Sequence, residues 1–208
     1  MKKLFVPFLL AMLIATPSLA KDVSSSAQLM VNAPWDFANS GDTDKTLAIS
    51  GHAEGAFMIN SNGCKMFFAY LGPHFKINEL DLWLMTGTFL EGDGGLSPMA
   101  SLRFNVNGGG WASWLNWFTE YDYTFPVETD GKNSHTDNYA YLYTQLTANI
   151  GKQTALGLAI EEFWIGNDRV ESAIGPKFSH GKVSFWPAWD FAPDSDTQLF
   201  IFRLSISP

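Results

Sequence analysis

The chain has little cysteine, little positive charge and no apolar run of bilayer length. Cys64 is the only cysteine in 208 residues, which excludes a disulfide scaffold. The 13 Lys and Arg residues are outnumbered by 21 Asp and Glu residues and form no basic stripe, so we expect no binding to nucleic acid. Apolar residues make up 46% of the chain and aromatic residues 15% of it, which suits a single folded domain.

The first twenty residues have the pattern of a secretory signal peptide. Lys2 and Lys3 precede an apolar run from residue 4 to 15. The helix breaker Pro17 follows, and Ser18 and Ala20 are the small residues at the two cleavage-site positions. We therefore predict a signal peptide over residues 1–20. The alternative is a membrane anchor, but a spanning helix needs about 20 apolar residues. Cleavage would leave eleven basic residues against 21 acidic ones.

Residues 21–44 show no sustained hydrophobic period. They contain a serine triplet at 24–26 and the polar stretch 41–44, which is typical of a flexible segment. We predict a flexible periplasmic leader over 21–44 and one folded domain over 45–208.

From about residue 46 onward, apolar residues recur at every second position, which is the period of a β-strand. In one segment Leu82 and Leu84 alternate with Asp81 and Trp83. No part of the mature chain has a convincing helical period. The sequence therefore predicts an all-β domain, built as a single antiparallel up-and-down barrel.

The alternating segments number about ten, and each is roughly ten to fifteen residues long, which exceeds the usual length of soluble strands and suits tilted membrane-spanning strands. Short connections are expected at 78–79, 107–110, 151–152 and 180–181, and the longest, near 125–137, falls in the opposite set. An even number of strands would place both termini on one side of the barrel.

The whole mature region resembles the small outer-membrane β-barrel proteins of Gram-negative bacteria. Its last strand, with Phe200, Phe202, Leu204 and Ile206 in alternation, resembles their C-terminal assembly signal, although the chain ends in Pro208 and not in an aromatic residue. The resemblance implies a transmembrane barrel in the outer membrane. It also implies contact with outer-membrane lipids and lipopolysaccharide, and with the outer-membrane assembly machinery.

A soluble barrel of the lipocalin type also alternates, with its apolar face pointing inward. Two features favour the membrane barrel. Charges stand in the middle of the polar faces, and the apolar faces form uniform aliphatic and aromatic rows, which a polar interior and surrounding lipid explain together.

If the polar faces point inward, hairpin register predicts interior neighbours. We expect an ion pair between Lys76 and Asp81, a cation–π contact between Trp186 and Arg203, and a pair of acids formed by Glu171 and Asp190. The full set predicted to line the interior is His52, Glu54, His74, Lys76, Asp81, Arg103, Tyr141, Glu161, Glu171, Lys177, Lys182, Trp186, Asp190 and Arg203.

His52, His74 and Glu54 are expected to be close together. These residue types bind metals, but a hydrogen-bonded interior is the favoured interpretation, and we expect no metal or cofactor. The Trp-rich segment 111–123 contains residues that could stack on sugars, whereas an interfacial aromatic girdle is the favoured reading.

Acidic residues gather near the predicted outer mouth, which would concentrate cations and repel anions. They are Glu91, Asp93, Glu128, Asp130, Asp137, Asp168, Asp190, Asp194 and Asp196. Because a barrel of about ten strands is nearly filled by its own side chains, a wide pore is disfavoured. The expected function is a narrow channel or solute-binding barrel for small cationic or neutral solutes, with a purely structural role as another possibility.

An enzyme needs a nucleophile with a positioned base. Ser134–His135 and Ser179–His180 pair these residue types only as sequence neighbours, which seldom gives a productive geometry on a strand or turn. Glu161 and Glu162 face opposite sides of their strand. An enzyme is therefore not favoured, and the two remaining alternatives are a lipid-modifying outer-membrane hydrolase and a soluble periplasmic lipocalin-like carrier.

Overall fold

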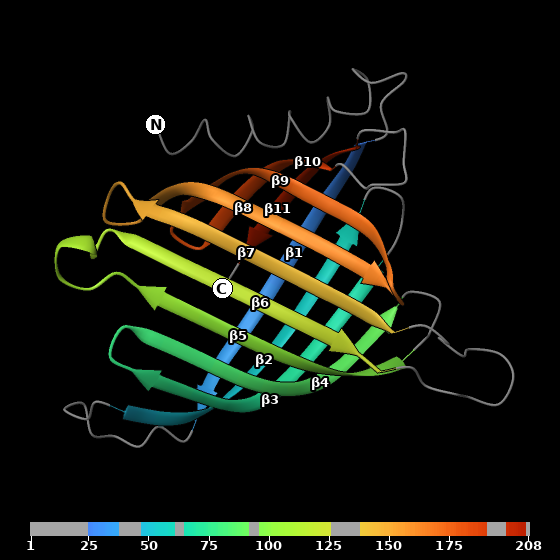
Figure 1. Cartoon of the computed structure of the whole chain (residues 1–208), viewed down its shortest axis with the longest axis horizontal. Helices are drawn as coiled ribbons and strands as arrows, with labels where there is room; N and C mark the ends of the chain where they lie inside the picture. Colours follow the sequence, from blue (N-terminus) through green and yellow to red (C-terminus); the bar gives the residue numbers. More distant parts are fainter. Residues whose placement is uncertain are drawn as a thin grey trace, which may run out of the picture.

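The computed structural model describes residues 25–37, 47–60, 65–91, 96–125, 138–190 and 199–206. These ranges contain eleven strands and one short 3-10 turn, η1 (Gly110–Ala112). The strands (Figure 1) are β1 (Ser25–Phe37), β2 (Leu47–Asn60), β3 (Lys65–Ile77), β4 (Leu80–Glu91), β5 (Leu96–Asn107), β6 (Leu115–Thr124), β7 (Tyr139–Asn149), β8 (Thr154–Ile165), β9 (Asp168–His180), β10 (Val183–Asp190) and β11 (Leu199–Ile206). In this part of the chain, no helix has the length and apolar character that a membrane span would require.

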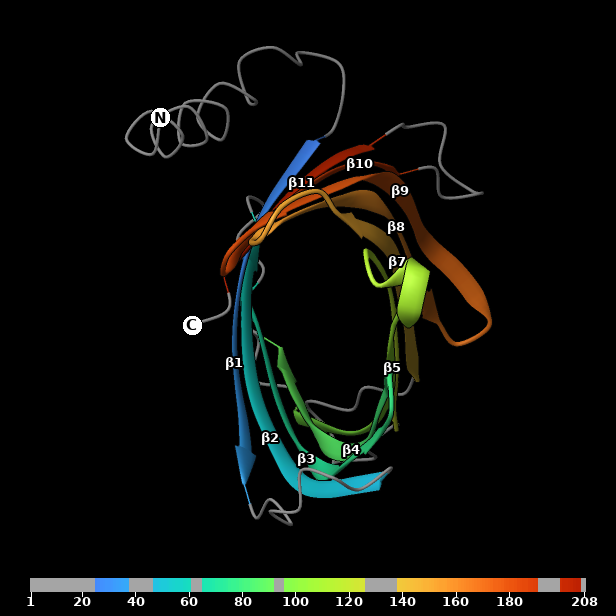
Figure 2. The ribbon, with the colours of Figure 1, turned by 90° about the vertical axis from the view of Figure 1, so that its left-hand side faces the viewer.

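The strands close into a single barrel, as the ring of ribbons in Figure 2 shows. Each strand pairs antiparallel with its neighbours in sequence, and the ring is closed by a parallel pairing between β1 and β11. The predicted all-β barrel is confirmed, with eleven strands where we expected ten. Because the number of alternating strands is odd, β1 and β11 run in the same direction and their pairing is parallel. The start of β1 and the end of β11 therefore lie at opposite ends of the barrel, and the prediction that both termini lie on one side is wrong.

The additional strand is β1, which lies in the segment predicted to be a flexible leader. Its alternation is visible in the exposed side chains of Leu29, Val31, Trp35 and Phe37. Pro34 stands within this strand, in the part beyond Val31 where β11 no longer pairs with β1. Proline is tolerated at such an edge because it has no N–H to donate to a missing neighbour.

The barrel has two distinct ends. One end, here called the turn end, carries the connections at 78–79, 108–114, 150–153 and 181–182. The opposite loop end carries the tight turn at 166–167 and the connections at 61–64, 92–95, 126–137 and 191–198, whose residues lie outside the described ranges. Asn78, Gly166 and Gly181 have positive φ angles of 52°, 63° and 59°, as tight hairpin turns require.

The turn between β9 and β10 differs from the predicted one. Gly181 and Lys182 form it, so His180 lies opposite Val183 and Asp190 lies opposite Ala173. The register differs by two residues, which keeps every side chain on its predicted face. It does separate Glu171 from Asp190, so the predicted pair of acids at the outer mouth is wrong.

Side-chain exposure shows which face points inward. Asp81, Arg103, Asp122, Glu161 and Arg203 are among the buried residues. In a single-layer barrel only the interior buries side chains, so these charged groups point inside. The large exposed residues are apolar, and they occupy the alternate positions: Leu84, Leu102, Leu146, Leu158 and Phe200 are examples, each 42–50% exposed. The barrel is therefore polar within and apolar outside.

Two Gly–Pro pairs interrupt the pairing of neighbouring strands. Pairing between β3 and β4 skips Gly72 and Pro73, and pairing between β9 and β10 skips the segment around Gly175 and Pro176. A Cβ on Gly175 would lie 1.9 Å from the carbonyl oxygen of Pro187, and one on Gly72 would lie 2.0 Å from that of Leu84. Glycine thus allows the close backbone approach that curves the sheet.

We predict that Gly175→Ala destabilises the barrel by about 1–3 kcal/mol, because the added methyl group overlaps backbone that cannot rotate away. The matched control is Gly55→Ala, since a Cβ on Gly55 meets no atom within 4 Å. Its free energy of unfolding should differ from that of the wild type by less than about 0.5 kcal/mol. Urea titration of the refolded full chain measures both, and equal stability of the two variants would contradict the close approach.

Candidate functional site

The polar interior contains three connected groups of side chains. The histidine network consists of Asp36, Ser50, His52, His74 and Asp81, and it lies near the turn end. The Arg103 cluster consists of Glu54, Tyr70, Arg103, Glu120 and Asp122. The Arg203 cluster consists of Tyr141, Tyr143, Glu161, Lys177, Trp186 and Arg203.

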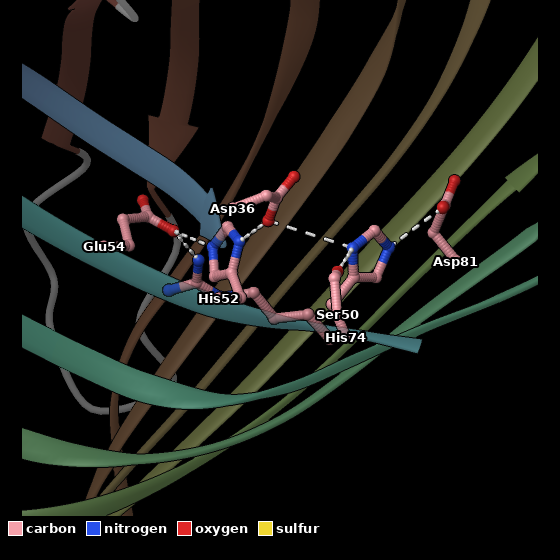
Figure 3. A network of polar contacts seen from close by, with 7 residues as sticks. Asp36, Ser50, His52, Glu54, His74 and Asp81 are labelled. Atoms are coloured by element: carbon pink, nitrogen blue, oxygen red, sulfur yellow. Dashed lines mark hydrogen bonds and ion pairs between the residues drawn. The ribbon is translucent and has the colours of Figure 1, made fainter. Parts of the chain in front are cut away.

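Strand register brings the histidine network together. Asp36 of β1 lies opposite His52 of β2, and Ser50 of β2 lies opposite His74 of β3. Asp81 is the second residue of β4 and lies opposite Lys76, as the two-residue turn at Asn78–Glu79 predicts. Four consecutive strands therefore present these side chains from one wall of the barrel (Figure 3).

The contacts within the histidine network form a chain. Nδ1 of His52 lies 2.5 Å from Oδ1 of Asp36, and Nδ1 of His74 lies 3.8 Å from the same oxygen. Nε2 of His74 lies 3.0 Å from Oδ1 of Asp81, while the Ser50 hydroxyl lies 3.3 Å from Nδ1 of His74 (Figure 3). The His74 ring stacks on Trp83 with 4.5 Å between centroids and 9° between planes, which fixes the orientation of the imidazole.

The Arg103 cluster connects opposite parts of the wall. Arg103 of β5 forms ion pairs with Glu54 of β2 and with Glu120 of β6, the latter at 2.5 Å. Its guanidinium lies 4.5 Å from the ring centroid of Tyr70, whose hydroxyl donates a 2.8 Å hydrogen bond to Asp122. One arginine thus neutralises carboxylates of two other strands that are largely shielded from water.

The Arg203 cluster repeats this arrangement on the other side of the barrel. Arg203 of β11 forms a bidentate ion pair with Glu161 of β8, across the two intervening strands β9 and β10, with one contact of 2.6 Å. Tyr141 donates a 2.6 Å hydrogen bond to Glu161, and Trp186 lies 5.1 Å from the guanidinium of Arg203. Lys177 donates to the hydroxyl of Tyr143 at 2.8 Å.

The predicted interior residues fall into four groups. Buried are His52, Asp81, Arg103, Glu161, Trp186, Asp190 and Arg203. Partly buried are Glu54, His74, Tyr141 and Lys177, whereas Lys76 has a side chain that is 56% exposed at the turn end and lies 3.4 Å from Asp81. The side chain of Glu171 is outside the description. Lys182 is the exception, because it is exposed in the turn itself and does not line the interior.

The predicted lining set lacks Asp36, Ser50, Tyr70, Glu120 and Asp122, although the strand period puts Ser50 and Tyr70 on the polar faces. Asp36 was missed because its strand was taken for a leader. Glu120 and Asp122 belong to the Trp-rich segment 111–123, which the sequence alone does not orient, because the tryptophans at 111, 114 and 117 do not all fall on one face of a strand. Among them, Trp111 precedes β6, and the 3-10 turn there resets the alternation. Starting the alternation at Trp117 would have placed both acids inside.

Some buried polar atoms have no hydrogen-bond partner within the described residues. They include the indole N–H of Trp83, Oδ1 of Asp122 and the hydroxyls of Ser97, Ser101 and Ser172. Buried polar groups are normally satisfied by water or ligand where protein atoms do not serve. These atoms are the part of the described interior whose hydrogen-bonding capacity the protein itself leaves unused.

His52 and His74 lie near each other, with 6.3 Å between ring centroids, but Asp36 connects them by hydrogen bonding and ion pairing. Across the described ranges, no group of three or more His, Cys, Asp or Glu side chains has the arrangement of a metal site. Of the acidic residues expected at the outer mouth, Asp168 is exposed, and Asp190 is buried and accepts a 3.0 Å hydrogen bond from the Ser172 N–H. The side chain of Glu91 is not described, and the other six lie outside the described residues, as do Cys64 and Ser134–His135.

Comparison of the chain with protein-family models, with curated proteins and with solved structures finds no match. What the chain does is therefore argued from its own geometry.

We predict that Arg203→Met destabilises the barrel by about 3–5 kcal/mol, because Glu161 is 1% exposed and would keep a buried charge without its guanidinium. The control is Lys76→Met. Lys76 is exposed, so removing its pair with Asp81 should cost less than about 1 kcal/mol. Urea unfolding of the refolded chains measures the difference, and similar losses for both variants would contradict the role of the Arg203 cluster.

Proposed function

We propose that this chain is an outer-membrane β-barrel that encloses an occluded, acidic interior. The observation that carries the proposal is the inverted polarity of the barrel. Lipid satisfies apolar side chains on the outer face, and the pairing of β1 with β11 over residues 25–31 closes the ring of strands. Strand lengths of 8 to 14 residues agree with tilted membrane-spanning strands.

The same polarity argues against the soluble carrier. A lipocalin-like barrel buries its aliphatic rows around a ligand and exposes its charges to water. In this barrel Leu84, Leu102 and Leu158 are each at least 42% exposed, while Arg103, Glu161 and Arg203 are at most 7% exposed. In water that arrangement would leave a large apolar surface uncovered and charges buried.

The interior is too well packed for a wide pore. Side chains that line an open water-filled channel remain accessible to water, whereas Glu161 and Trp186 are each 1% exposed. Carboxylates outnumber basic groups in the Arg103 cluster and the histidine network, which favours cations over anions. We infer a barrel that binds or slowly passes small cationic solutes through the turn end, where Asp36 and Lys76 are accessible.

We predict small cation-selective current steps, or none, when the purified full chain is added to a planar lipid bilayer. The reason is that Arg103, Arg203 and their carboxylates fill the middle of the barrel. Reversal potentials in a salt gradient measure the selectivity. Large steps without ion preference would contradict the occluded interior, and a chain that stays in the aqueous phase would contradict membrane insertion.

The membrane face can be tested by placing one charge on each side of the wall. We predict that Leu84→Arg impairs insertion into lipid vesicles by about 2–4 kcal/mol, because Leu84 is exposed in the middle of β4. Ser184→Arg, on the inner face near the turn end, should insert almost normally. Heat-modifiable electrophoretic mobility measures the folded fraction, and equal tolerance of the two changes would contradict the assignment of the faces.

A further inference from the structure

Ser50, His74 and Asp81 form a side-chain arrangement that the occluded barrel does not need. They come from three consecutive strands and are separated by 24 and 7 residues in sequence. Ser50 lies 3.3 Å from one ring nitrogen of His74, and Asp81 lies 3.0 Å from the other. A hydroxyl, an imidazole and a carboxylate in this order are the elements of an activated serine nucleophile.

The carboxylate decides where the imidazole carries its proton. Asp81 accepts hydrogen bonds only, so Nε2 of His74 carries the hydrogen that it donates to Oδ1. Nδ1 is then left with its lone pair toward Ser50, and the serine hydroxyl donates to it. This is the orientation in which histidine acts as a general base.

A second carboxylate, that of Asp36, lies beside His74. Asp36 lies 3.8 Å from Nδ1, too far for a hydrogen bond in the resting state but close enough to stabilise a proton that arrives there. Asp36 is itself held by His52 at 2.5 Å. Lys76 brings a positive charge near the imidazole, since it lies 3.4 Å from Asp81, but its side chain is exposed at the turn end.

A small molecule could reach Ser50 and His74 from the turn end. Ser50 is only partly buried, and the side chain of Asp36 is 56% exposed, in contrast to the closed middle of the barrel. Trp83 offers an aromatic surface beside the site, and Asp36 offers a negative charge. These features suit a small molecule that combines a positive charge with an acyl group.

We propose that Ser50 is the nucleophile of an esterase site that takes small carboxylic esters, preferentially ones with a positively charged group. The Oγ of Ser50 bonds to the ester carbonyl carbon as its proton passes to Nδ1 of His74. The bond from that carbon to the alcohol oxygen then breaks, and the alcohol leaves with the proton from His74. Water, deprotonated by His74, attacks the acyl-serine, which releases the carboxylic acid and restores the Ser50 hydroxyl.

This inference goes beyond the membrane and solute-binding roles, since it needs only the folded barrel and no conductance. It also differs from the serine–histidine neighbours seen in the sequence. His180 contacts the hydroxyl of Thr154 at 2.9 Å through Nδ1, so it is engaged by another strand and not by Ser179.

The experiment is labelling of the refolded full chain with a fluorophosphonate probe, followed by mass spectrometry of the modified peptide. We expect one adduct per chain, on Ser50. Ser50→Ala should abolish the adduct, and His74→Gln should slow labelling by about 100-fold or more, since a general base contributes that much. Asp81→Asn should slow it also, because the asparagine can leave His74 in the wrong tautomer.

Ser184→Ala is the matched control, since Ser184 also faces the interior near the turn end but lies opposite Ser179 and Ser205. Its labelling should equal that of the wild type. Heat-modifiable mobility verifies that each variant is folded before labelling. Absence of an adduct on the folded wild type, or labelling that His74→Gln leaves unchanged, would overturn the proposal and leave the Ser50–His74 contact as a structural hydrogen bond.

Turnover of acetylcholine, a small cationic carboxylic ester, tests the substrate class against 3,3-dimethylbutyl acetate, a neutral ester of the same shape with an alcohol leaving group, and the released acetic acid is measured for both. We expect a higher kcat/KM for the cationic ester, and Asp36→Asn should reduce that preference by about tenfold, as the loss of one charge-assisted contact predicts. An equal rate for the two esters would overturn the proposed charge preference, while the labelling result separately decides the nucleophile.

Discussion

The constraint on which this structure depends is the alternation of side chains in a sheet that closes on itself. Each strand sends every second side chain into a shared interior that has no second layer to fill it. Because the inward positions carry arginines and carboxylates, the barrel can close only if those charges meet partners across strands. The ion pairs Arg103–Glu54 and Arg203–Glu161 satisfy this requirement, and each joins strands that are not neighbours.

Such pairs also determine register. A slip of one residue between two strands would turn Arg203 toward the outer face and an apolar side chain into the Arg203 cluster. Both errors are costly, so charges that contribute little net stability still favour one alignment of the strands. The outer apolar rows act in the same direction, because the same slip would remove them from their common face.

The features that the sequence predicts correctly are those decided by local periodicity and by tight turns. The strand period places Asp81, Arg103 and Glu161 inside, and the Asn78–Glu79 turn places Lys76 opposite Asp81. The strand period likewise puts Trp186 and Arg203 on the inner face, where the structure places them opposite each other.

The features that it does not predict depend on distant parts of the chain or on one ambiguous residue. β1 was missed because Pro34 conceals its alternation, and only closure against β11 shows that the segment is a strand. The β9–β10 turn was misplaced because His180–Gly181 and Gly181–Lys182 both put a glycine in the turn. The contact of Arg103 with Glu54 could not be foreseen, since it depends on how far the sheet curves between β2 and β5.

The parts of the interior differ in their access to water as well as in their position. The two arginine clusters occupy the closed middle, where each charge has partners and little water reaches them. The histidine network lies instead at the turn end, where β1 continues past Val31 with β2 as its only described neighbour and Asp36 is exposed. A hydrogen-bonded serine there adds little to a barrel already closed by its arginines, because an accessible hydroxyl is satisfied by water when its partner is removed. Stability therefore does not explain why Ser50, His74 and Asp81 converge, whereas the proposed esterase chemistry would use all three side chains at an accessible mouth.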